Sequence, residues 1–184
     1  MELKDKMRPV IKNTQFGLLT GLSLLMIFFT LCLAEGCSYS FTGASISPSV
    51  KTISISYLPN HAALVQPTMS RKLTEAIRDK FTSQSSLNLV NTNGDLNIEG
   101  EITRYSTEPV AITSEQQGAL QRLTVTVNIR FTNKQDPKQD FESSFTRFAD
   151  YDAKNQLSTV EETLIDIIND ELSQDVFNKA LVNW

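Results

Sequence analysis

An alternation of apolar and polar side chains within residues 120–132, unbroken from Arg122 to Thr132, constrains the fold more than any other feature of the sequence. Five apolar residues occupy every second position, namely Leu123, Val125, Val127, Ile129 and Phe131. Successive side chains of a strand point to opposite faces of a sheet, so a period of two predicts a strand with one buried and one wet face. A chain with such a strand must supply further elements to cover the apolar face.

Two segments on the N-terminal side also have strand character. In residues 51–58, the side chains of Ile53, Ile55 and Tyr57 alternate with hydroxyl-bearing residues, which predicts a half-buried strand with these three on the core face. Residues 86–91 are compatible with one more short strand, but their pattern is too brief to count it in the sheet.

Two more strands are predicted on either side of residues 120–132. The first begins after an Asn93-Gly94 turn signal and runs to about residue 105, with Gly100 standing where an inward side chain is expected. A glycine there indicates a bulge or a close backbone approach. The second covers residues 139–149, with Phe141 and Phe145 on one side and Phe148 on the other. Between the first of these strands and residue 120, residues 107–119 form a long polar connection.

Two segments carry the apolar stripe of an amphipathic helix. In residues 67–82 the stripe is Met69, Leu73, Ile77 and Phe81. In residues 158–182 it is Val160, Leu164, Ile167, Ile168, Leu172, Val176, Ala180 and Leu181. Ser158 and Glu161 have the spacing of a capping box, which would start the second helix at this point.

These elements predict an α+β fold in the order β-α-β-β-β-α. Burying every apolar face at once requires a two-layer sandwich, with two helices packed on a mixed, mainly antiparallel, four-stranded sheet. Because a helix joins the first strand to the next, these two strands are expected to be parallel, with a right-handed crossover.

The N-terminal region differs from the rest of the chain. Basic residues in positions 1–17 precede an apolar run at 18–33, and Cys37 follows a short exit sequence. This pattern predicts an export signal over residues 1–36, a lipidated Cys37 leading a serine-rich tether over 37–50, and a folded domain over 51–184. An uncleaved anchor and an unmodified cysteine are the alternatives. A diacylglycerol on the sulfur explains a lone cysteine without a disulfide.

Charge and residue types narrow the function. After position 36 the chain carries 13 Lys and Arg against 18 Asp and Glu, a net charge of −5, which argues against nucleic acid as the main ligand. His61 is the only histidine, and neither a metal-ligand set nor a nucleophile with a neighbouring base is present in the sequence. We therefore expect no cofactor and no catalysis, and we expect a structural or solvent-facing His61.

Basic side chains offer a binding hypothesis. Arg104, Arg122, Arg130 and Arg147 all fall in predicted strands. If they shared the uncovered face of the sheet or its ends, they could bind an anionic ligand. The alternative is a solvated strand face with scattered charge.

An ordered series of short segments resembles the LptE family of lipopolysaccharide-assembly lipoproteins, in the form found in Bacteroidota. The series covers the whole chain after the leader and comprises Cys37, Tyr39–Gly43, Lys51–Ile55, Asn60–Ala62, Leu73–Phe81, Asp95–Tyr105, Leu123–Asn128, Phe145–Phe148 and the final helix. The fold implied by the resemblance, two helices on a four-stranded mixed sheet, agrees with the one predicted from periodicity.

The resemblance implies a non-enzymatic function at the periplasmic face of the outer membrane. An LptE-like protein plugs the LptD β-barrel, assists its assembly and helps lipopolysaccharide reach the outer leaflet. Arg122, Arg130, Arg147 and Lys154 are then the candidates for contact with the barrel or with lipopolysaccharide. The alternative function is a lipid-anchored periplasmic module that binds or scaffolds another envelope partner.

Overall fold

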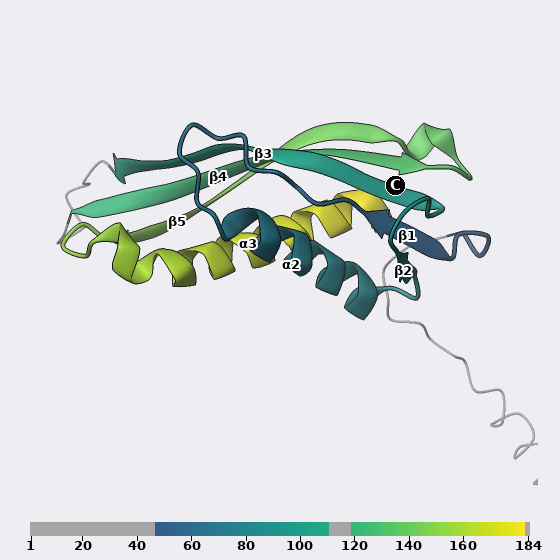
Figure 1. The fold of residues 1–184 in the computed structure, drawn as a ribbon, viewed down its shortest axis with the longest axis horizontal. Coiled ribbons are helices and arrows are strands. Elements are labelled where there is room, and N and C mark those ends of the chain that lie inside the picture. The colour runs from purple at the N-terminus through teal and green to yellow at the C-terminus, as the bar shows by residue number, and fades with distance from the viewer. Residues whose placement is uncertain (1–46, 111–118, 183–184) are drawn as a thin grey trace, which may run out of the picture. The chain divides into compact units, whose positions relative to one another are not determined.

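The computed structural model describes residues 47–110 and 119–182 (Figure 1). The predicted leader, Cys37 and most of the tether lie outside the described residues. The elements in chain order are β1 (Thr52–Ile55), α2 (Met69–Gln84), β2 (Asn88–Val90), β3 (Leu96–Val110), β4 (Leu120–Asn133), a 3-10 turn (Pro137–Gln139), β5 (Phe141–Asp152) and α3 (Leu157–Leu181). Neither described helix combines the length and the apolarity that a membrane-spanning segment requires.

The strands form one sheet in the order β2-β1-β3-β4-β5. β1 is parallel to both β2 and β3, and β3, β4 and β5 form an antiparallel meander. The predicted parallel pairing of the first strand with the strand at 96–105 is confirmed. The predicted number of four strands is wrong, because β2 adds a fifth strand at the edge. A three-residue strand has too few positions for an alternation to be visible in the sequence.

The core lies between the sheet and the two helices, which lie on the same side of the sheet (Figure 1). The inward side chains of β4 are 0% exposed, as the alternation predicted. All four residues of the α2 stripe, from Met69 to Phe81, are also 0% exposed. Burying a large apolar side chain stabilises the fold by roughly 1.5–3 kcal/mol.

Helix α3 differs from the prediction at its start and in its stripe. Its N-cap is Gln156, without a side-chain hydrogen bond, so the predicted capping box is wrong. Glu161 instead accepts a hydrogen bond of 2.6 Å from the hydroxyl of Tyr105, a buried side chain of β3 that needs a polar partner. Ile167 is 47% exposed, and Ile165 is buried in its place.

The edge of the sheet beside β3 departs from simple alternation. β1 ends at Ile55, but Ser56 and His61 still donate backbone hydrogen bonds to β3, both at 2.9 Å. Tyr57, predicted on the core face, is 58% exposed, and Leu58 is buried instead. The irregular backbone after Ile55 changes which side chain points inward.

Gly100 marks a close backbone approach, as the sequence predicted. A Cβ atom at this position would lie 2.2 Å from the carbonyl oxygen of Asn128 on β4, which no side chain tolerates. A register shift follows between Ile102 and Arg104. β3 then continues to Val110, so the first four residues of the segment predicted as a polar connection, 107–110, belong to the strand.

Asp95 connects the turn before β3 to the start of β1 through hydrogen bonds. Its Oδ2 accepts hydrogen bonds from the backbone N–H groups of Lys51 and Thr52 at 3.0 and 2.9 Å, and from the Thr52 hydroxyl at 2.8 Å. These donors, the Lys51 N–H above all, lower the pKa of Asp95 to about 2. In the same turn Asn93 has a φ of 65°, the left-handed conformation that asparagine tolerates.

Candidate functional site

The face of the sheet opposite the helices is mainly polar, and we call it the open face. Its side chains are those of β3, β4 and β5 that alternate with the buried ones. Its charged members are Glu99, Glu101, Arg104, Glu108, Arg122, Arg130, Glu142, Asp150 and Asp152. Carboxylates outnumber guanidinium groups, so this face is not the basic surface that a strongly anionic ligand would need.

Each open-face arginine is paired with a carboxylate, two of them across neighbouring strands and one along its own strand. Arg122 stands directly opposite Asp150 and donates to both of its oxygens, at 2.7 and 2.8 Å. Arg130 stands opposite Glu142, with 3.4 Å between Nε and Oε2. Arg104 pairs with Glu108 along the same strand. Cross-strand pairs of opposite charge stabilise a sheet modestly and leave little free charge on it.

Arg122 is the most firmly placed of these arginines. Its guanidinium carbon lies 3.6 Å from the centroid of the Phe148 ring, so the group stacks on an aromatic face while it binds Asp150. The Arg122 hydrogen bond lowers the pKa of the Asp150 carboxyl, and the same contact raises the pKa of Arg122. Phe148 is 48% exposed, whereas Leu120 and Val110, which lie on the same face at its far end, are only partly exposed. Arginine and aromatic side chains are frequent energetic centres of protein interfaces.

The structure does not gather the four predicted contact residues on one surface. Arg122 and Arg130 lie on the open face, whereas Arg147 lies on the side that the helices cover. Arg147 donates to both carboxylate oxygens of Asp175 on α3, at 2.6 Å each, and this partner raises its pKa. Lys154 follows the end of β5, where its backbone N–H bonds Asp152. Arg104, Arg122 and Arg130 therefore share the open face, and Arg147 does not.

The sequence contained the information needed to place Arg147. It is separated by an even number of positions from Phe141 and Phe145, so a regular strand must put all three on one side. Phe148 and Asp150, which hold Arg122, are the residues that the sequence reasoning missed. Their involvement depends on the register of β4 against β5, which the sequence does not reveal.

The described residues contain no group of histidine, cysteine and acidic side chains that could hold a metal ion. His61 is exposed, and its Nδ1 lies 2.6 Å from Oε2 of Glu101. This contact ties the segment after β1 to β3 and matches the structural or solvent-facing role expected of His61.

Comparison with known proteins identifies the family. The model of the LptE lipopolysaccharide-assembly family matches residues 50–180. No curated protein sequence matches the chain closely enough to count as a relative.

Solved structures of similar fold include several lipoproteins. A protein of Xanthomonas campestris shares 9% identity at a TM-score of 0.50, covering 76% of this chain and 90% of its own. A minor lipoprotein of Acinetobacter baumannii shares 18% identity at a TM-score of 0.48, covering 71% and 92%. The rare lipoprotein B of Shewanella oneidensis shares 15% identity at a TM-score of 0.43, covering 70% and 92%. Because the family match spans both helices and all five strands, the chain belongs to the LptE lipopolysaccharide-assembly family.

Proposed function

We propose that this protein is the LptE-type component of an outer-membrane lipopolysaccharide translocon. In this role it plugs an LptD β-barrel, assists the assembly of that barrel and helps lipopolysaccharide insert into the outer leaflet, without catalysing a reaction. The observation that carries the proposal is the family match over residues 50–180, which includes the whole described sheet and both helices.

The open face gives this proposal a physical basis. The interior wall of an outer-membrane barrel is polar, so a plug needs a surface of hydrogen-bonding groups rather than an apolar patch. Strands β3 to β5 present such a surface, on which Thr126 and Thr146 share a hydrogen bond of 2.9 Å and Asn128 donates to Glu142 at 3.0 Å. Arg122 and Phe148 add one rigid, partly apolar contact to it.

The location follows from the N-terminal pattern. We propose that residues 1–36 are removed, that Cys37 carries acyl chains and that residues 37–50 connect the lipid to the fold. Two or more acyl chains anchor a protein stably, which one chain does not. The protein would then sit on the periplasmic side of the outer membrane. Cys37→Ala is expected to leave the domain folded but mislocalised, as fractionation of the membranes would reveal.

Contacts with the barrel or with lipopolysaccharide are proposed for the predicted basic residues. Arg122 and Arg130 lie on the open face, where each is already paired with a carboxylate of β5, and Lys154 follows the end of that strand. A contact with a partner would add to these pairs or replace them. Arg147 would have to exchange its carboxylate partner Asp175 for the new contact.

The test is purification of the tagged protein from detergent-solubilised outer membranes, followed by mass spectrometry of the proteins that accompany it. We expect an LptD-type barrel in near-stoichiometric amount. A well-expressed, lipidated protein that arrives without a barrel would overturn the plug function. The alternative, a lipid-anchored module that binds another envelope partner or ligand, would then be favoured.

A further inference from the structure

Strand β5 forms one edge of the sheet along its whole length of 12 residues, with α3 running beside it (Figure 1). The Ala153 N–H donates a hydrogen bond of 2.9 Å to the carbonyl oxygen of Ala119, just before β4. Backbone groups of an antiparallel strand point alternately to its two sides, so the odd-numbered residues of β5 bond to β4. The residues whose N–H and C=O groups point away from the sheet are therefore Glu142, Ser144, Thr146, Phe148 and Asp150. These backbone groups have no hydrogen-bond partner among the described residues.

The other free edges of the described sheet are protected against pairing, whereas β5 is not. Natural proteins protect an edge with a very short strand, a bulge, a proline or a charge. β2, at the opposite edge, has three residues, and the end of β3 beyond β1 carries a register shift after Ile102 and a proline, Pro109. β5 pairs with β4 over all 12 residues without a shift, contains neither proline nor lysine, and has its one inward charge, Arg147, neutralised by Asp175. Its outer side is thus a regular row of hydrogen-bonding groups on which another strand can pair.

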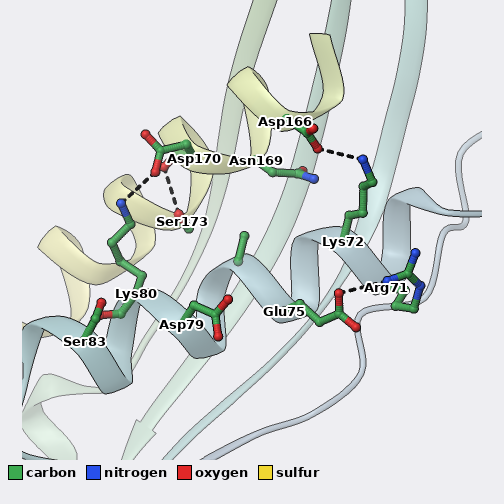
Figure 2. A pocket seen from close by; sticks show the side chains of 11 residues that line it. Arg71, Lys72, Glu75, Asp79, Lys80, Ser83, Asp166, Asn169, Asp170 and Ser173 are labelled. Carbon is green, nitrogen blue, oxygen red and sulfur yellow. Dashed lines mark hydrogen bonds and ion pairs between the residues drawn. The ribbon is translucent and has the colours of Figure 1, made fainter. Parts of the chain in front are cut away.

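The two sides of helix α3 differ in a way that favours such a strand. The side that faces α2 is closed by ion pairs, because Lys72 lies 2.8 Å from Asp166 and Lys80 lies 2.8 Å from Asp170 (Figure 2). Neither described helix covers the other side of α3.

Apolar side chains of α3 are exposed on this uncovered side, next to the β5 edge. Ile167 is 47% exposed and lies one turn before Glu171, whose carboxylate is 4.0 Å from Nε of Arg147 on β5. The partly buried apolar residues that pack against the core all come from β5 or α3 and are Phe141, Phe145, Leu157 and Val160. The core is therefore incompletely covered along this edge, and an added strand would cover it with its own inward apolar side chains.

The charges of β5 argue against a second copy of this chain as the added strand. Glu142, Asp150 and Asp152 lie on the open face of β5, where this strand has no basic residue. A two-fold dimer would pair the two β5 strands antiparallel. In the two registers with the fullest overlap, Glu142 would meet Asp150 or Asp152 of the second copy, and like charges directly opposite each other destabilise a sheet.

The charges across the sheet indicate instead a strand with basic side chains. Two rows run across β3, β4 and β5, namely Glu99, Arg130 and Glu142, and Glu108, Arg122 and Asp150. In each row an arginine stands between two carboxylates, so a basic residue on a sixth strand would continue the alternation of charge. Glu142 and Asp150 are eight positions apart on β5, which sets the spacing of the two basic residues.

We propose that β5 accepts an extended segment of a partner protein as a sixth strand, with apolar side chains toward α3 and basic side chains opposite Glu142 and Asp150. Backbone hydrogen bonds supply the affinity of such an added strand, and its alternating side chains supply the specificity. The pairing uses the edge of the sheet and does not depend on the proposed contact of the open face with a barrel.

The test uses the full chain, labelled with ¹⁵N, in detergent. The probe is a synthetic peptide with blocked ends that spans Glu142 to Asp150, in which valine alternates with threonine and a lysine stands at each end. A control peptide has glutamate in place of both lysines. The readout is hydrogen exchange of the outward backbone N–H groups of Ser144, Thr146 and Phe148, followed by NMR. We expect fast exchange in the free chain and about tenfold or greater protection by the lysine peptide, because hydrogen-bonded amides exchange only when they open.

Substitutions separate strand pairing from attraction between charges. Ser144→Pro removes one outward N–H and keeps the bonds to β4, since an edge strand tolerates proline where its ring faces solvent. Ser144→Ala loses the same hydroxyl but keeps the N–H. Ser144→Pro should bind the lysine peptide about tenfold more weakly than Ser144→Ala, as expected for one lost hydrogen bond of about 1.4 kcal/mol. Thr107→Pro, which places the same ring on the free edge of β3, should bind as the unchanged chain does.

A second variant tests the charges without a proline. Glu142→Gln combined with Asp150→Asn keeps the shape of both side chains and removes their charge. The chain with both changes should lose its preference for the lysine peptide over the glutamate peptide. A preference that persists would refute the proposed pairing of basic residues with these carboxylates.

Several further results would overturn the edge site. They are the absence of protection by the lysine peptide, equal protection by the glutamate peptide, and equal binding by Ser144→Pro and Ser144→Ala. Slow exchange of the outward amides in the chain alone, together with a dimer in analytical ultracentrifugation, would show that a second copy occupies the edge and would refute a partner strand. Barrel co-purification is measured on the same protein. A barrel retained without peptide binding refutes the edge site alone, and peptide binding without a barrel refutes the translocon function alone.

Discussion

The two faces of β4 and β5 differ in what their side chains do. On the helix-covered face, residues such as Val127 and Ile129 are 0% exposed and hold the two layers together. On the open face, Thr126, Asn128 and Arg130 make hydrogen bonds and ion pairs with their neighbours on β5 while remaining in contact with solvent. Burial stabilises far more than exposed polar pairing does, so one face carries the stability of the fold and the other is available for a partner.

The largest expected effect tests this difference within one strand. Phe131→Ala removes a side chain that is 0% exposed and stacks on Phe141 at 5.2 Å between ring centroids. We expect the free energy of unfolding to fall by about 3–5 kcal/mol in urea denaturation. Thr124→Ala, on the open face of the same strand, should change it by less than about 0.5 kcal/mol. Similar losses from both would mean that the open face is also covered.

Two arginines on opposite faces sharpen the comparison. Arg147 and Arg122 each donate to both oxygens of one aspartate, but Arg147 joins β5 to α3 whereas Arg122 lies on the open face. Arg147→Ala should lower the free energy of unfolding by about 1 kcal/mol and reduce the recovered barrel less than Arg122→Ala does, because Arg147 would first have to leave Asp175. Arg122→Ala should leave the unfolding midpoint nearly unchanged and reduce the recovered barrel. The opposite assignment would show that the covered face is the one that meets the barrel.

A pH titration of stability tests whether the charge of one polar group, Asp95, stabilises the fold. Asp95 bonds backbone N–H groups at the start of β1, and its pKa is about 2 when the protein is folded, against about 3.9 for an unfolded chain. A lowered pKa contributes stability that is present above the unfolded value and is lost as the pH falls through the folded value. The unfolding midpoint of the unchanged chain should therefore exceed that of Asp95→Asn at pH 6, and the gap should shrink between about pH 4 and pH 2. A gap that stays constant over this range would mean that the charge of Asp95 is not what stabilises the turn.

The smallest expected effect concerns α3. Ile167 is 47% exposed, whereas Ile168 is fully buried. Ile167→Ser should change the free energy of unfolding by less than about 0.5 kcal/mol, and Ile168→Ser should cost several times as much. A marked loss of unfolding free energy in isolated Ile167→Ser protein would mean that Ile167 packs in the core, as the sequence predicted.

Much of the fold and little of the site could be predicted. The strand at 120–132 and the stripe of α2 follow a strict period, so their buried residues were predicted correctly. In β5 the predicted inward residues Phe141 and Phe145 are only partly buried, and Ala149 and Tyr151 are the buried ones. The open face as a polar surface follows from the same alternation. Its pairs do not, because Arg122 meets Asp150 and Phe148 only through the register of β4 against β5.

The sequence by itself determined the α+β class, the placement of the long strands and the close approach at Gly100, because each depends on a period or a steric limit that is local to the chain. Only the tertiary structure decided the rest. It added β2 as a fifth strand and turned the side chains of Tyr57 and Ile167 outward. It also paired the Glu161 carboxylate with the Tyr105 hydroxyl, where the sequence had predicted a helix cap. It also left the Asn169 carboxamide unpaired between two helices. These outcomes depend on which distant segments come together, and the free energy of such contacts is not encoded in the spacing of neighbouring residues.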